Sequence, residues 1–171
     1  MGVHVRGTLQ RIVRNHSYPP DPKDIVIECK KIFKKHKCDK IFLVTEDLLY
    51  FENFKKYFKN NLVYLKTPRS YPTIFGSHNI HFKDYCRSLH RYKLGKETII
   101  DVLLLSKTDV FLFTDSNVWR FATVLSKKNQ FKYQLKTHRN SKNIFFARWL
   151  WYLKYIFPLL FGKINYKIKK Y

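Results

Sequence analysis

The chain has 171 residues, of which 45% are apolar, and this is enough to build the core of one ordinary domain. Five glycines and six prolines exclude collagen-like and low-complexity chains. Lys and Arg number 34 against 12 Asp and Glu, and the net charge of +22 favours a polyanion, a nucleotide phosphate or an anionic lipid surface as partner. An AT-rich coding sequence also enriches Lys, so the charge alone does not choose among these partners.

The acidic residues are confined to one part of the chain. All of them lie between Asp21 and Asp115, whereas residues 116–171 hold 13 Lys and Arg and no acid. We therefore expect three parts, divided where the composition changes: a main lobe over 1–127, a basic connector over 128–143, and an aromatic, basic C-terminal helix or membrane-interface segment over 144–171.

The first half of the chain predicts strands that alternate with helices. Short apolar runs bounded by polar residues are typical of buried parallel strands, and Asp before Pro is typical of a helix start. In chain order, the sequence predicts a strand over 3–5, a helix from Asp21 and Pro22 to about Lys37, a strand over 40–44, a helix over 46–59 capped by Thr45, and a strand over 62–65.

The second half continues the alternation after a loop over 67–81, which is longer than most connections. A helix is expected from before Gly95 to Ser106, followed by a strand over 110–113 and a helix that opens at Ser116. This alternation predicts an α/β fold: a Rossmann-like parallel sheet with right-handed crossovers and helices on both faces.

The cysteines and the ends of the chain bear on its location. Cys29, Cys38 and Cys86 are odd in number and not spaced as a metal-ligand cluster, so we expect reduced thiols. We expect neither a secretory signal nor a transmembrane helix, since the longest low-charge run is too short to span a bilayer. These features favour the cytoplasm or the cytoplasmic face of a membrane.

Polar clusters follow the predicted strands, at the edge where open α/β sheets bind ligands. Arg6 beside Gly7 is suited to a bidentate contact with a diphosphate, and the helix start at Ser116 favours an anion. Each cluster alone also fits an ordinary structural role. The clusters are His4, Arg6 and Thr8; Thr45, Glu46 and Asp47; Asp101 within a helix; and Thr114, Asp115, Ser116 and Asn117.

In this order the clusters resemble the C-terminal half of the α1,6-fucosyltransferase and NodZ-like glycosyltransferases. The resemblance covers residues 3 to about 125, and its most specific part is the D-x-L-L-L-S block followed by S-N-V. It rests on His4-Val5-Arg6-Gly7-Thr8, Ile41-Phe42-Leu43-Val44-Thr45-Glu46-Asp47, Asp101-Val102-Leu103-Leu104-Leu105-Ser106-Lys107-Thr108-Asp109 and Ser116-Asn117-Val118-Trp119-Arg120-Phe121-Ala122.

The resemblance implies that residues 1–127 are the nucleotide-sugar-binding lobe of a GT-B enzyme. Such an enzyme transfers fucose from GDP-fucose to a glycan acceptor, with inversion and without a metal. The resemblance assigns to Arg6 the catalytic role of gripping the β-phosphate, and to Asp101 that of reading the guanine edge. It assigns to the donor site the remaining candidates: His4, Gly7, Thr8, Glu46, Asp47, Ser116 and Asn117.

The chain departs from this family in three ways. Gly7-Thr8-Leu9-Gln10 stands where the α1,6 enzymes carry Arg-Thr-Asp-Lys, so a second cation and an acid are missing. Arg14 stands where those enzymes carry the glutamate regarded as general base, a group that an inverting transfer needs. Because the match starts at residue 3, we expect the other lobe of the enzyme to be lost or to come from a partner chain.

Several functions are therefore compatible with the sequence. The first is a fucosyltransferase-like enzyme, or its donor-binding half. The alternatives are a non-catalytic truncated relic, and a basic module that binds a polyanion or a membrane surface. No nucleic-acid-binding motif is present, which disfavours nucleic acid. The aromatic run over 148–161, followed by lysines, suits a membrane interface and equally a helix packed on the lobe.

Overall fold

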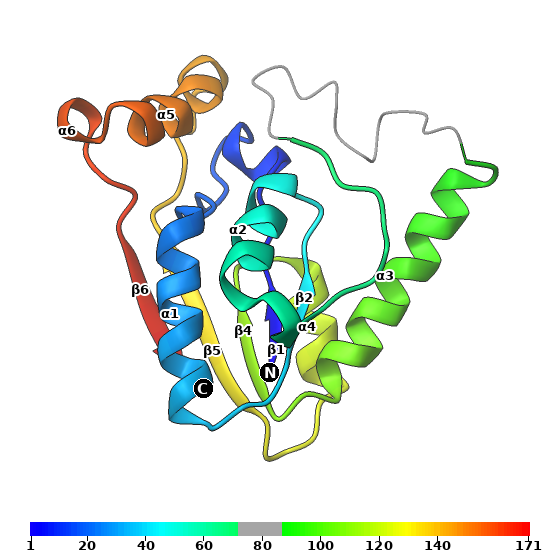
Figure 1. The fold of residues 1–171 in the computed structure, drawn as a ribbon. Coiled ribbons are helices and arrows are strands. Elements are labelled where there is room, and N and C mark those ends of the chain that lie inside the picture. The colour runs from blue at the N-terminus through cyan, green and yellow to red at the C-terminus, as the bar shows by residue number, and fades with distance from the viewer. Residues whose placement is uncertain (72–86) are drawn as a thin grey trace.

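The computed structural model describes residues 1–71 and 87–171, which form an α/β fold around one six-stranded sheet (Figure 1). The strand order is β3-β2-β1-β4-β5-β6; the first five strands are parallel, and β6 is antiparallel to β5. This order is that of a doubly wound Rossmann-like sheet, so the predicted fold class is confirmed. The strands are β1 (Gly2–His4), β2 (Ile41–Val44), β3 (Leu62–Val63), β4 (Val110–Phe113), β5 (Phe131–Thr137) and β6 (Tyr166–Lys170).

Helices cover both faces of this sheet. The helical elements are η1 (Leu9–Arg11), α1 (Pro22–Lys35), α2 (Leu48–Phe58), η2 (Lys59–Asn61), α3 (His90–Ser106), α4 (Asn117–Val124), α5 (Ile144–Ile156) and α6 (Pro158–Phe161). Because successive strand residues point to opposite faces, β4 contributes to two cores. Leu112 packs in the cluster with α1 and α2, whereas Phe111 and Phe113 pack in the cluster with α3 and α4.

Two of the three predicted helix caps are found in the structure. Asp21 caps α1 by accepting from Lys23 N at 2.8 Å, and Ser116 caps α4, both as predicted. The predicted cap of α2 is wrong. Thr45 Oγ1 accepts instead from Asp47 N at 3.2 Å, and Asp47 caps the helix by accepting from Leu49 N at 2.9 Å. The helix consequently begins two residues later than expected.

The C-terminal part of the chain belongs to the sheet. The segment 128–143, expected as a basic connector, contains β5, and the end of the chain supplies the edge strand β6. Tyr133 and Leu135 of β5 are buried in the core that α1 and α2 cover. Phe131, Tyr133 and Leu135 alternate with polar residues, so the period-2 pattern of a strand is present within the basic segment. The expected C-terminal helix is present as α5, with Trp151 buried.

Some expectations fall on residues that the structure does not describe. Most of the loop predicted over 67–81 and the whole of Cys86 lie in 72–86, outside the described residues.

Cys29 and Cys38 are free thiols, and burial raises the pKa of Cys29 above its usual value. Among the helices described, none combines the length and the apolar composition needed to cross a bilayer.

Candidate functional site

A cleft opens at the carboxyl edge of the sheet, beside the switch point where β1 lies between β2 and β4. Its volume is about 180 Å³, and its walls come from the ends of β1 and β2, the segment after β3, and helices α3 and α4. In a doubly wound sheet this is the position where ligands bind. Four of the predicted site residues line the cleft: His4, Arg6, Glu46 and Asp101.

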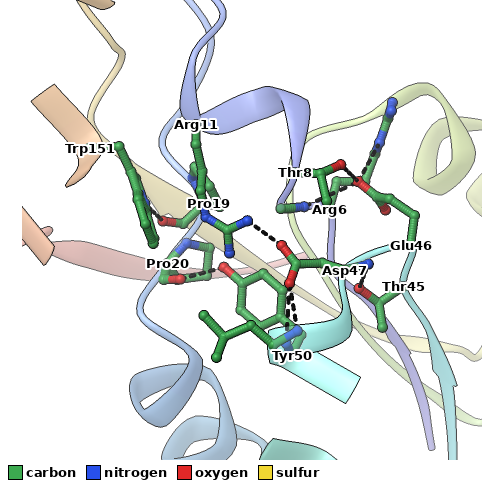
Figure 2. Close-up of polar contacts among 12 residues, drawn as sticks. Arg6, Thr8, Arg11, Pro19, Pro20, Thr45, Glu46, Asp47, Tyr50 and Trp151 are labelled. Carbon is green, nitrogen blue, oxygen red and sulfur yellow. Dashed lines mark hydrogen bonds and ion pairs between the residues drawn. The ribbon is translucent and has the colours of Figure 1, made fainter. Parts of the chain in front are cut away.

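One wall of the cleft is built around the carboxylate of Glu46. Glu46 Oε1 accepts from Gly7 N at 3.2 Å and from Thr8 Oγ1 at 3.3 Å, and lies 3.6 Å from Arg6 Nε (Figure 2). The Arg6 side chain is 30% exposed, so it remains accessible from the cleft. A guanidinium, a backbone N–H and a hydroxyl are the donors that a phosphate group takes in proteins. Glu46 therefore occupies, with its own carboxylate, a set of donors suited to a bound anion.

The end of β1 is joined to the end of β4 through His4. The His4 ring is buried, and its Nδ1 lies 3.3 Å from Ser116 Oγ, which also accepts from Trp119 N at the start of α4. Burial, reinforced by the charge of Arg6, lowers the pKa of His4 to about 3. His4 is therefore neutral at physiological pH, and Arg6 carries the positive charge on this wall.

The opposite wall carries Asp101, in the middle of α3. No donor among the described residues hydrogen-bonds to its carboxylate, and no described cation pairs with it. Burial raises the pKa of Asp101 from 3.8 to about 7, an effect that the charge of Arg69 opposes and that of Glu97 reinforces. An acceptor that is partly desolvated and unpaired is well suited to a ligand donor entering the cleft.

The cleft also contains a cation that the sequence analysis missed. Arg69 donates to Leu65 O at 3.0 Å and to Thr67 O at 3.1 Å, and its guanidinium carbon lies 4.1 Å from the ring centroid of Phe51. Its Nε is buried and has no hydrogen-bond partner among residues 1–71 and 87–171. These contacts hold Arg69 against the cleft wall. A single Arg in an irregular loop carries no periodic or motif signal, so the sequence could not reveal it.

Asp47, expected in the donor site, lies in the core instead. Its carboxylate forms an ion pair with Arg11, and both side chains are fully buried. The Arg11 guanidinium carbon lies 4.3 Å from the ring centroid of Trp151 on α5 and 5.6 Å from that of Tyr50 on α2 (Figure 2). Burial raises the pKa of Asp47, and Arg11 opposes that rise. Asp47 thus positions the residues around it and does not face the cleft.

This ion pair explains the glycine at position 7. A Cβ added to Gly7 would overlap the Asp47 carboxylate and lie 2.7 Å from Tyr50 Cε2. The chain can therefore approach Asp47 so closely only with glycine at this position.

The remaining predicted residues lie beside the cleft and outside its lining. Thr8 holds Glu46, Ser116 caps α4, and Asn117 is exposed on the first turn of α4.

Comparison with known proteins does not identify a family or a function for this chain. No protein-family model matches the chain, and no curated protein is significantly similar to it. Within residues 1–71 and 87–171, no group of three or more His, Cys, Asp and Glu side chains is arranged to hold a metal ion.

We expect Gly7→Ala to destabilise the protein by about 1–3 kcal/mol, because the added methyl overlaps a buried ion pair that cannot move away. Gly95→Ala on α3 is the matched control. A Cβ at Gly95 meets no atom within 4 Å, and alanine in a helix gains about 0.5–1 kcal/mol over glycine. Urea denaturation of both variants measures the difference. Equal stability of the two variants would contradict the packing described for Gly7.

Proposed function

We propose that the cleft binds a guanosine diphosphate sugar, with GDP-fucose as the donor, and that the chain is the donor-binding lobe of a fucosyltransferase-like glycosyltransferase. One observation carries the proposal. Arg6 and Asp101, which the family resemblance assigns to opposite ends of the nucleotide, line the same cleft although they are distant in the sequence. The switch-point position of the cleft supports the same conclusion.

The guanine end of the donor is assigned to Asp101. A carboxylate can accept from the N1–H and the N2 amino group of guanine together, a pair of adjacent donors that uracil does not present. Asp101 has no competing donor among the described residues, so its acceptor atoms are available. Because the pKa of Asp101 is about 7, the ionised form that this contact requires is populated at and above neutral pH.

The diphosphate end is assigned to Arg6, Gly7 N–H and Thr8 Oγ1, the donors that Glu46 now occupies. When the sugar leaves, negative charge builds on the β-phosphate, and a guanidinium in contact with it stabilises that charge as a metal ion would. Arg69 supplies a second cation in the cleft, where the sequence departs from the family by lacking the second arginine. The transfer is therefore proposed to be metal-independent.

The acceptor side is assigned to a partner. The cleft volume of about 180 Å³ is smaller than the roughly 300–1,000 Å³ of typical ligand pockets. A cleft that forms only half of a binding site has such a small volume, because a second lobe supplies the other walls. Arg14, at the family's base position, is exposed and cationic, so we propose that a partner chain supplies the second lobe, the base and the glycan contacts. The free thiols Cys29 and Cys38 fit a cytoplasmic location.

Calorimetric titration of the full chain with GDP, GDP-fucose, GDP-mannose and UDP tests this function. We expect guanosine-selective binding, weakened about 10- to 100-fold by Arg6→Ala and by Asp101→Asn, because each loses a charge-assisted hydrogen bond. Arg14→Ala is the charge-matched control and should bind as the wild type does. Indifference to all four nucleotides at millimolar concentration would overturn the proposal.

The affinity for GDP should depend on pH through Asp101. Its pKa in the folded chain is raised to about 7, so the ionised acceptor is lost as the pH falls through that value, and GDP affinity should fall between pH 8 and pH 6. The raised pKa of Asp101 also lowers the free energy of unfolding at every pH above the usual pKa of 3.8, and this loss is complete above pH 7. Asp101→Asn should accordingly flatten the titration and raise the melting temperature at pH 8. A pH dependence unchanged in Asp101→Asn would assign the titration to another group.

We expect Glu46→Gln to tighten binding of GDP and of inorganic pyrophosphate. The substitution removes the negative charge that competes with a phosphate for Arg6 and Gly7 N–H. Asp39→Asn, an exposed acid before β2 and outside the cleft lining, controls for the change in net charge. Weaker binding of both ligands to Glu46→Gln than to Asp39→Asn would show that Glu46 itself contacts the donor.

A further inference from the structure

Helices α5 and α6 present large apolar side chains to solvent, at the same end of the molecule as the carboxyl edge of the sheet (Figure 1). Leu159 and Leu160 on α6 are 96% and 80% exposed. Monomeric proteins rarely expose a contiguous apolar patch of this kind without an interaction partner. We call this patch the α5–α6 surface; its residues are Ile144, Phe145, Phe146, Trp149, Tyr155, Ile156, Phe157, Leu159, Leu160 and Phe161.

The opposite face of α5 is firmly packed, so the exposure does not come from a detached helix. Ala147 and Trp151 are buried, and Trp151 Nε1 donates to Pro19 O at 3.1 Å. The Trp151 ring lies over the Arg11 guanidinium. Asn140, just before α5, donates to Ala147 O at 2.9 Å. The core thus holds the α5–α6 surface in place, while the side chains of this surface remain between 40% and 96% exposed.

The charges near this surface are positive. Residues 116–171 hold no acid, and exposed Lys142 and Arg148 pair with no described carboxylate. Lys154 donates to Phe161 O at 2.6 Å, which ties α5 to α6. Asp21 and Asp24 at the start of α1 share a pocket with Lys154 and Lys163 and offset part of their charge.

We propose that the α5–α6 surface binds an anionic lipid bilayer, lying in its headgroup region. Exposed Leu159 and Leu160 protrude from a single helical turn, which suits insertion among acyl chains better than a contact between two folded surfaces. Trp149 and Tyr155 on α5 belong to the residue types that favour the headgroup level. Lys142, just before α5, and Arg148 on α5 are exposed cations that can contact anionic lipid.

Co-sedimentation of the full chain with phosphatidylcholine vesicles, with and without phosphatidylserine, tests this proposal. We expect binding that requires phosphatidylserine and weakens with added salt. The double variant Leu159→Glu/Leu160→Glu should reduce vesicle affinity by about tenfold or more, since it removes the protruding apolar side chains. The matched control is Phe121→Glu/Val124→Glu, which places the same charges on exposed apolar positions of α4, 65% and 81% exposed in the wild type.

Lipid binding and self-association give different results with these variants. Vesicle binding lost equally in both double variants, or independent of phosphatidylserine, would overturn the proposal. A surface that holds a second copy of the chain would also overturn it; Leu159→Glu/Leu160→Glu would then convert a dimer to a monomer in analytical ultracentrifugation without changing vesicle binding. Circular dichroism of both variants shows whether the fold is unaffected. Neither this control nor vesicle binding requires a bound nucleotide, so the test is independent of the proposed function.

Discussion

The buried ion pair between Arg11 and Asp47 holds together the parts of the protein that build the cleft. Both side chains are inaccessible to solvent, and removing one partner from such a pair costs about 3–5 kcal/mol because a charge is left unpaired in the core. Asp47 also caps α2, while the Arg11 guanidinium lies between the rings of Tyr50 and Trp151. The pair therefore connects η1, α2 and the C-terminal helix α5.

The position of Asp47 determines what its neighbours do. Asp47 points into the core from the end of β2, whereas Glu46, one residue earlier, lines the cleft beside Arg6 (Figure 2). The close approach of the chain to Asp47 requires Gly7, whose N–H then reaches Glu46. One buried contact thus fixes the geometry of the donors around Glu46. The same contact links the packing of α5, through Trp151, to the wall of the cleft.

Sequence patterns predicted much of the fold because the strong signals are local. The apolar runs of β2 and β4, and the caps Asp21 and Ser116, follow from neighbouring residues. Strand β5 is not among the predicted strands. Its Phe131, Tyr133 and Leu135 alternate with polar residues, as in a strand, but the positive charge of 128–143 favours a connector. Its place in the sheet depends on pairing with β4 and β6, which no local pattern encodes.

The candidate site was predictable only in part, for a related reason. In doubly wound sheets, ligands bind at the carboxyl ends of the strands, where the strand order reverses. From this rule His4, Arg6, Glu46 and Asp101 were candidates for one site, and all four line the cleft. It could not show that Asp47 turns inward, since its partner Arg11 lies in a short irregular segment. Arg69 reaches the cleft through backbone contacts in a loop, and these exist only in the folded chain.

A crystal structure of the chain with GDP would show whether one cleft holds both ends of a guanosine diphosphate. We expect the β-phosphate within hydrogen-bond distance of Arg6 and Gly7 N–H, Glu46 displaced from these donors, and the guanine edge on Asp101. GDP bound elsewhere on the chain, or bound in the cleft without contact to Arg6 and Asp101, would show that these residues do not form a donor site.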